Sequence, residues 1–236
     1  MSTMKLQLEQ YPRRIAIILA IAAGLFTLLA ATAQILDKEE LDEPLSRIAR
    51  QFDPDEEANV FNWYQSATLL CCAAALAVTA GIARGSDGRF VNHWRGLALL
   101  LLFAAIDETA QIHENLFSSG DSSGRWYLWI LLYVGVLALI GLAYVRFFFR
   151  LPRSVRWGWV IAAAVYLGGA VGVELLDGYY AEAVGTDNLV YRMIAVVSEA
   201  MEMFGVVLFL HAQLSYLASR IAEVRVVFAG ETNPQA

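Results

Sequence analysis

Six apolar stretches, each of about 20 residues or more, limit most strongly how this chain can fold. A helix of about 20 residues crosses the hydrocarbon core of a bilayer, because it rises about 1.5 Å per residue. The stretches therefore predict an all-α integral membrane protein, a bundle of six transmembrane helices, and not a water-soluble domain. The predicted spans are residues 14–36, 60–83, 96–114, 126–148, 157–177 and 191–217.

The length of 236 residues leaves room for one membrane domain and little else. We assign residues 1–225 to that domain and residues 226–236 to a short polar tail. The only two cysteines, Cys71 and Cys72, are neighbours inside the second stretch. A disulfide between adjacent residues would be strained, so we expect both to fill space as small apolar side chains. We expect no nucleic-acid partner.

The distribution of basic residues predicts the topology. Membrane proteins carry an excess of Lys and Arg in their cytoplasmic loops. A cytoplasmic N-terminus places most of the 17 basic residues inside and the acidic loops outside. Six spans then make the C-terminus cytoplasmic as well, in the inner (plasma) membrane. The basic residues predicted to lie inside are Lys5, Arg13, Arg14, Arg84, Arg89, Arg95, Arg146, Arg150, Arg153, Arg156, Arg220 and Arg225.

The segment between the first two stretches, residues 37–59, is rich in acid. Within it, Leu45, Ile48 and Phe52 recur at helical spacing after Pro44, which favours the first turn of a helix. This pattern predicts a short amphipathic helix on the outer membrane surface. The alternative is a solvated loop.

Three of the apolar stretches carry acidic residues where a bilayer tolerates them poorly. An ionisable side chain at the centre of a transmembrane helix costs about 2.5–3.5 kcal/mol even on insertion scales, so each is a candidate functional residue. The candidates are Asp107, Glu108, His113 and Glu114 in the third stretch, Glu174 and Asp177 in the fifth, and Glu199 and Glu202 in the sixth.

Helical spacing predicts that these acids meet. At 100° per residue, each acidic pair in the fifth and sixth stretches lies on one helix face. Counting about 1.5 Å per residue from the outer boundary puts Asp107, Glu108, Glu199 and Glu202 roughly 10–15 Å deep. Gly168 and Gly172 are spaced to pack against a neighbouring helix, and we expect the acids to face elsewhere.

Carboxylates crowded at that depth must share protons or a cation, because an apolar surrounding disfavours their charged form. We predict a divalent metal ion held by the eight candidate residues. With a His nitrogen available, Zn, Fe or Mn is favoured over Ca or Mg. Metal-bound water could then attack a lipid or lipid-linked substrate in a hydrolysis or oxidation, with Glu108 or Glu202 as proton acceptor.

Other interpretations of the same acids remain open. A proton- or cation-coupled transporter would protonate them alternately, although polar residues are scarce in the inner half of the predicted bundle. A non-catalytic subunit would use them to contact helices of a membrane protein partner or of a homo-oligomer. The plainest interpretation is that the acids cap helix ends at the outer interface.

Overall fold

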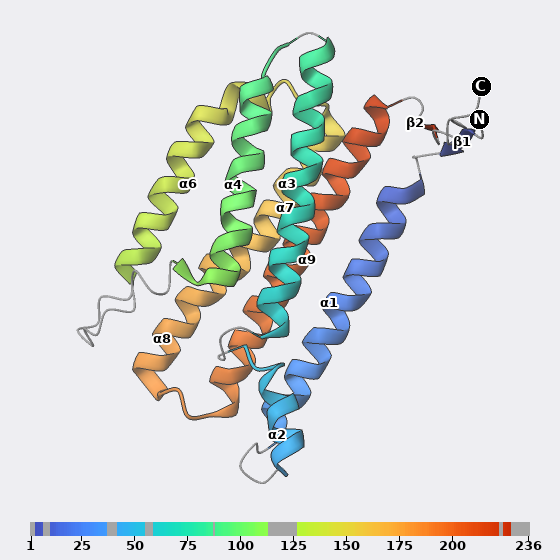
Figure 1. The fold of residues 1–236 in the computed structure, drawn as a ribbon. Helices are drawn as coiled ribbons and strands as arrows, with labels where there is room; N and C mark the ends of the chain where they lie inside the picture. Colours follow the sequence, from blue (N-terminus) through green and yellow to red (C-terminus); the bar gives the residue numbers. More distant parts are fainter. Residues whose placement is uncertain are drawn as a thin grey trace.

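The computed structural model describes residues 3–6, 10–36, 42–54, 59–86, 88–112, 127–221 and 224–227. Long helices, lying side by side, make up the body of the molecule (Figure 1). Their order along the chain is α1 (Tyr11–Ile35), α2 (Glu43–Arg50), α3 (Val60–Ser86), α4 (Val91–Ala110), α6 (Tyr127–Phe148), α7 (Arg153–Leu167), the π-helical segment η2 (Gly168–Val173), α8 (Glu174–Val184) and α9 (Leu189–Arg220).

Four helical stretches are long and apolar enough to cross a membrane: α1, α3, the continuous α7–η2–α8 stretch, and α9. Large apolar side chains point outward from the bundle, among them Ile18, Leu139 and Leu142, which are each at least 66% exposed. An apolar outer surface of this kind suits contact with lipid better than contact with water. The helical fold and its membrane-spanning character therefore agree with the sequence.

Two helices fall outside this group of four for separate reasons. α4 carries Arg95 near its start and Asp107 and Glu108 near its end, so no 18-residue window within it is nearly free of charge. The described apolar part of α6 is short, Val134–Phe148. The number of membrane crossings consequently remains a prediction.

The two ends of the chain lie at one end of the bundle (Figure 1). There β1 (Thr3–Leu6) pairs antiparallel with β2 (Val224–Val227), with Thr3 opposite Val227. The first residues of the predicted polar tail thus belong to a strand, and residues 228–236 lie outside the described part.

The predicted amphipathic helix is present as α2, and Pro44 lies in its first turn, where a missing N–H costs nothing. Ala49 is buried, whereas Leu45 and Ile48 are exposed. α2 contacts α1 near the end of the bundle opposite the chain termini (Figure 1).

Helix α9 is the centre of the packing, because it contacts α1, α3, α7, η2 and α8. It supplies buried side chains to all three apolar clusters of the bundle, while α4 packs mainly against α3. Small residues allow close approach: a Cβ at Gly205 would lie 2.7 Å from the backbone nitrogen of Tyr166 on α7. The residues of α9 in the clusters are Val196, Met203, Val206, Val207, Leu210 and Tyr216.

We predict that Gly205→Ala lowers the free energy of unfolding by about 1–3 kcal/mol, because the added methyl group meets backbone that cannot rotate away. The measurement is thermal unfolding of the purified protein in detergent. Gly141→Ala on α6 is the matched control, since a Cβ added there would have no neighbouring atom within 4 Å. Equal stability of the two variants would contradict the close α7–α9 contact.

Candidate acidic site

Glu202 lies at the centre of a group of carboxylates contributed by three helical segments. Its side chain is within electrostatic range of Glu199 on the same helix, Glu108 of α4 and Glu174 of α8. Each of these four residues is partly buried. We call Glu108, Glu174, Glu199 and Glu202 the acidic centre. Ionised carboxylates repel one another, so bringing all four together requires either protonation or a compensating interaction.

The π-helical segment η2 brings the α8 acids towards α9. A Cβ at Gly169 would lie 2.7 Å from the Ser198 carbonyl oxygen and 3.2 Å from Cγ of Glu202, so only glycine allows this approach. A π-turn inserts an extra residue into a helix and thereby rotates the residues that follow it. Glu174 comes directly after η2 and consequently faces the same neighbour as Gly169.

The prediction for the fifth stretch is therefore corrected in part. Gly168 does pack on α9, since a Cβ there would lie 2.7 Å from Cε of Met201. Gly172 does not, because its nearest neighbour is the Leu167 carbonyl oxygen of its own helix at 4.0 Å. The prediction assumed 100° per residue throughout, and that spacing fails across a π-turn.

Helix α3 contributes two amide side chains that the sequence-based prediction did not include. Gln65 is buried and donates from Nε2 to a carboxylate oxygen of Glu202 at 3.1 Å. One turn earlier, Asn62 donates from Nδ2 to Glu108 at 3.3 Å. The sequence signal for them was two amides, three residues apart, within a predicted membrane span.

A hydrogen bond from a side chain of α3 to the backbone of α4 joins the two helices beside these amides. Ser66 donates its hydroxyl to the carbonyl oxygen of Ala105 at 2.6 Å, close to Glu108 on the next turn of α4. α4 then ends at Ala110, and Gln111 adopts the left-handed conformation with φ of 51°. The continuous helix α4 thus ends before the predicted span does. His113 and Glu114, two of the predicted ligands, lie outside the described residues.

The remaining predicted acids lie beside the acidic centre. Asp107 is on the last turn of α4, and its carbonyl oxygen accepts from the backbone N–H of Gln111 at 2.6 Å. Asp177 is one turn beyond Glu174 and interacts with the side chain of Tyr191 near the start of α9. Neither is among the residues whose charge acts on Glu202.

Within the described ranges, no three or more His, Cys, Asp and Glu residues lie close enough together to form a ready metal site. The carboxylates of the acidic centre therefore interact through space without converging on one point. A cation here would need ligands from water, a local contraction of the helices, or further side chains.

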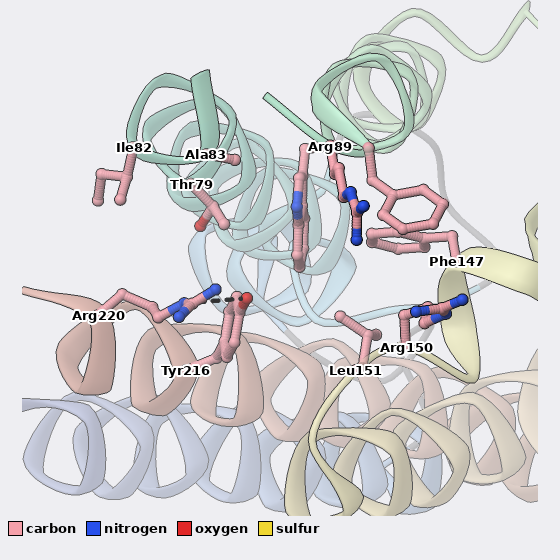
Figure 2. Close-up of a pocket in the computed structure, with 11 residues that line it drawn as sticks. Thr79, Ile82, Ala83, Arg89, Phe147, Arg150, Leu151, Tyr216 and Arg220 are labelled. Carbon is pink, nitrogen blue, oxygen red and sulfur yellow. Dashed lines mark hydrogen bonds between the residues drawn. The ribbon is translucent and has the colours of Figure 1, made fainter. Parts of the chain in front are cut away.

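A cavity of about 220 Å³ (Figure 2) lies at the opposite end of the bundle, where the chain termini are found (Figure 1). Its basic and aromatic lining comes from α4 and the residues just before it, from the end of α6 and the turn that follows, and from α9, while α3 contributes Thr79, Ile82 and Ala83. The molecule thus has two chemically distinct regions, one acidic and one basic.

The fold and the acidic centre define a class of protein: a helical bundle, with several helices of membrane-spanning length, that holds carboxylates between its helices. The chain belongs to the family described as a domain of unknown function, DUF8692, whose model matches residues 10–217. No curated protein and no solved structure matches it.

We predict that Gly169→Ala disturbs the acidic centre, because the added methyl group pushes η2 away from Ser198 and Glu202. The free energy of unfolding should fall by about 1–3 kcal/mol, as for other overpacked contacts. Gly172→Ala is the matched control, three residues along the same segment, and should leave thermal stability nearly unchanged. A greater loss in the control would overturn the assignment of Gly169 as the contact point.

Proposed function

We propose that this protein is a six-span inner-membrane protein with cytoplasmic termini, and that its acidic centre faces outward and binds a divalent cation. The observation that carries the proposal is the grouping of Glu202 with Glu199, Glu108 and Glu174 between helices. The chain termini lie at the end of the bundle where α3, α6 and α9 end (Figure 1), and the last turns of these helices carry Arg84, Arg146 and Arg220. Basic residues at that end support a cytoplasmic position for it.

Glu202 and Glu108 each accept a hydrogen bond from a neutral amide of α3. An amide donor favours the charged carboxylate but brings no positive charge of its own. We propose that bound protons or a metal ion balance the charge of these neighbouring carboxylates. Carboxylate and amide oxygens are ligands for hard divalent cations, and such ions often keep several water ligands. A hydrated ion does not require a closed cage of protein atoms.

A chemical use follows if the bound ion activates water. A divalent cation lowers the pKa of its bound water, and a nearby carboxylate can accept the proton released. Glu202 and Glu108 are suited to that role, because each is oriented by a hydrogen bond from α3. The substrate would be a lipid or lipid-linked molecule, since the outward surface of the bundle is apolar.

A second function, cation- or proton-coupled transport, is favoured by polar residues further along the α3–α9 interface. Gln213 is fully buried and donates from Nε2 to the hydroxyl of Thr79 at 2.8 Å. Cys72 lies between this pair and Gln65, with Sγ 3.9 Å from the Val206 carbonyl oxygen. Gln65, Cys72 and Thr79 are spaced seven residues apart and so follow one face of α3. A carrier would move its ion along this line.

Glu202→Gln tests the cation proposal directly. It removes a negative ligand while nearly preserving shape, so the metal content of the purified protein should fall. The free energy of unfolding should drop by more than about 1 kcal/mol, because a bound ion stabilises the folded state by mass action. Metal content is measured by elemental mass spectrometry and stability by thermal unfolding.

The matched control is Glu182→Gln, an exposed acid on α8 outside the acidic centre. It should leave both quantities unchanged. If the acids instead share protons, Glu202→Gln relieves repulsion and stability should be equal or higher. Unchanged metal content in a folded Glu199→Gln, Glu202→Gln double variant would refute cation binding.

The topology is tested by cysteine labelling in a Cys71→Ser, Cys72→Ala background. We predict that Thr186→Cys, in the α8–α9 connection, reacts in intact cells with a membrane-impermeant thiol reagent. Ser154→Cys, at the start of α7, should react only after lysis, because it lies at the end carrying the basic residues. Both positions are exposed, so access of the reagent is limited only by the membrane. The reverse labelling pattern would invert the proposed orientation.

A further inference from the structure

The basic cavity at the terminal end of the bundle has the composition of an anion site. Three arginines, Arg89, Arg150 and Arg220, are among its lining residues (Figure 2). None of the eleven described residues that line it is acidic. All three arginines are exposed and therefore accessible from solvent. The acidic residues nearest in sequence, Asp87 and Glu223, lie outside the described part of the chain.

One of the arginines is held in place by the wall of the cavity. Nε of Arg220 donates to the hydroxyl of Tyr216 at 3.3 Å, and its guanidinium carbon lies 5.5 Å from the centre of the same ring. The cation–π contact and the hydrogen bond both restrict the Arg220 side chain. A restricted guanidinium loses less entropy when it binds an anion than a freely rotating one does.

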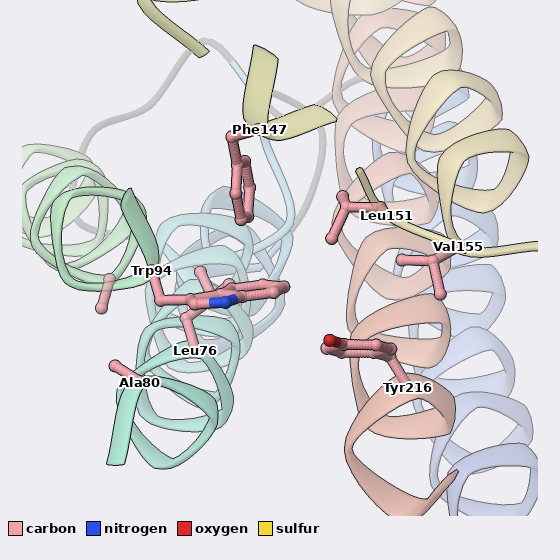
Figure 3. Close-up of a cluster of buried hydrophobic side chains, with 8 residues drawn as sticks. Leu76, Ala80, Trp94, Phe147, Leu151, Val155 and Tyr216 are labelled. Carbon is pink, nitrogen blue, oxygen red and sulfur yellow. The ribbon is translucent and has the colours of Figure 1, made fainter. Parts of the chain in front are cut away.

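The floor of the cavity is rigid and aromatic. The rings of Trp94 and Tyr216 are stacked, with centroids 5.4 Å apart and planes 18° apart. Phe147 meets the Trp94 ring edge-on at 4.7 Å (Figure 3). Trp94, Phe147 and Tyr216 are all buried, as are Leu76 and Leu151 beneath and beside them. The cavity is therefore preformed by core packing from α3, α4, α9 and the end of α6.

The size of the cavity restricts the ligand. The cavity volume is about 220 Å³. Sites for whole drug-sized ligands occupy about 300–1,000 Å³. The cavity therefore suits a small anionic group and not an entire lipid. Its arginines favour phosphate, since planar guanidinium groups bind phosphate oxygens in pairs.

We propose that the cavity formed by Arg89, Arg150 and Arg220 over Trp94 and Tyr216 binds the phosphate group of an anionic phospholipid or of a soluble phosphate compound. Basic pockets between transmembrane helices at the cytoplasmic side bind anionic headgroups, and the proposed topology puts this cavity on that side. The site lies at the opposite end of the bundle from the acidic centre. Phosphate binding in the cavity therefore does not depend on cation binding in the acidic centre.

The test uses the full-length protein in detergent, with phosphatidylglycerol, phosphatidylcholine and inorganic phosphate as probes. Native mass spectrometry measures the affinity for each lipid. We expect phosphatidylglycerol to bind at least about tenfold more tightly than phosphatidylcholine, a difference of about 1.4 kcal/mol. The Arg150→Gln, Arg220→Gln double variant should lose about that factor for phosphatidylglycerol alone.

Arg84→Gln with Arg146→Gln is the matched control, because both arginines are exposed at the same end of the molecule and do not line the cavity. It should bind phosphatidylglycerol as the wild type does. Arg150→Lys with Arg220→Lys keeps the charge and should retain more affinity than the Gln pair. Thermal unfolding verifies that each variant is folded.

Competition identifies the source of the phosphate group. Displacement of phosphatidylglycerol by inorganic phosphate would assign the site to phosphate itself, and hence to soluble compounds as well. Binding without such competition would assign it to the lipid headgroup. Equal affinity for the two lipids, or equal loss in the Gln double variant and its control, would overturn the proposal.

Discussion

The surrounding structure must offset the mutual repulsion among the carboxylates of the acidic centre. Glu202 lies within electrostatic range of three other acids, on two neighbouring helical segments as well as its own. The helices nevertheless pack closely at this point, with η2 against α9 at Gly169. Apolar packing along α9 stabilises this contact, and so do the hydrogen bonds that amide side chains of α3 donate to the carboxylates. A positive charge bound in the acidic centre would remove the remaining cost.

The chemistry of the chain is divided between the two ends of the bundle. Four carboxylates gather near one end, and arginines surround an aromatic cavity at the other. Both sets depend on α9, which supplies Glu199 and Glu202 to the first and Tyr216 and Arg220 to the second. The buried Gln213–Thr79 pair joins α9 to α3 between the two sets, and Thr79 also lines the cavity. One helix thus connects a proposed cation site with a proposed phosphate site through a continuous packed interface.

The π-turn in η2 allows a glycine and an acid of the same helical stretch to face α9 together. In a regular α-helix, the glycines and acids of the α7–α8 stretch would face different neighbours. The extra residue in η2 allows Gly169 to approach the α9 backbone and Glu174 to lie within range of Glu202 in the same contact. π-turns occur frequently at functional sites, because the local change of register redirects a few side chains without breaking the helix.

The sequence by itself determined the helical class, the positions of the long apolar helices and the short helix after Pro44, because these depend on periodicity and on the length that a bilayer requires. It also identified the acids, since charges inside apolar stretches are conspicuous. Only the tertiary structure decided that Gln65 and Asn62 join them, that Gly169 and not Gly172 makes the contact, and that α4 ends at Ala110. These features depend on which helix faces are neighbours and on a local departure from 3.6 residues per turn, and neither is encoded in the spacing of one segment.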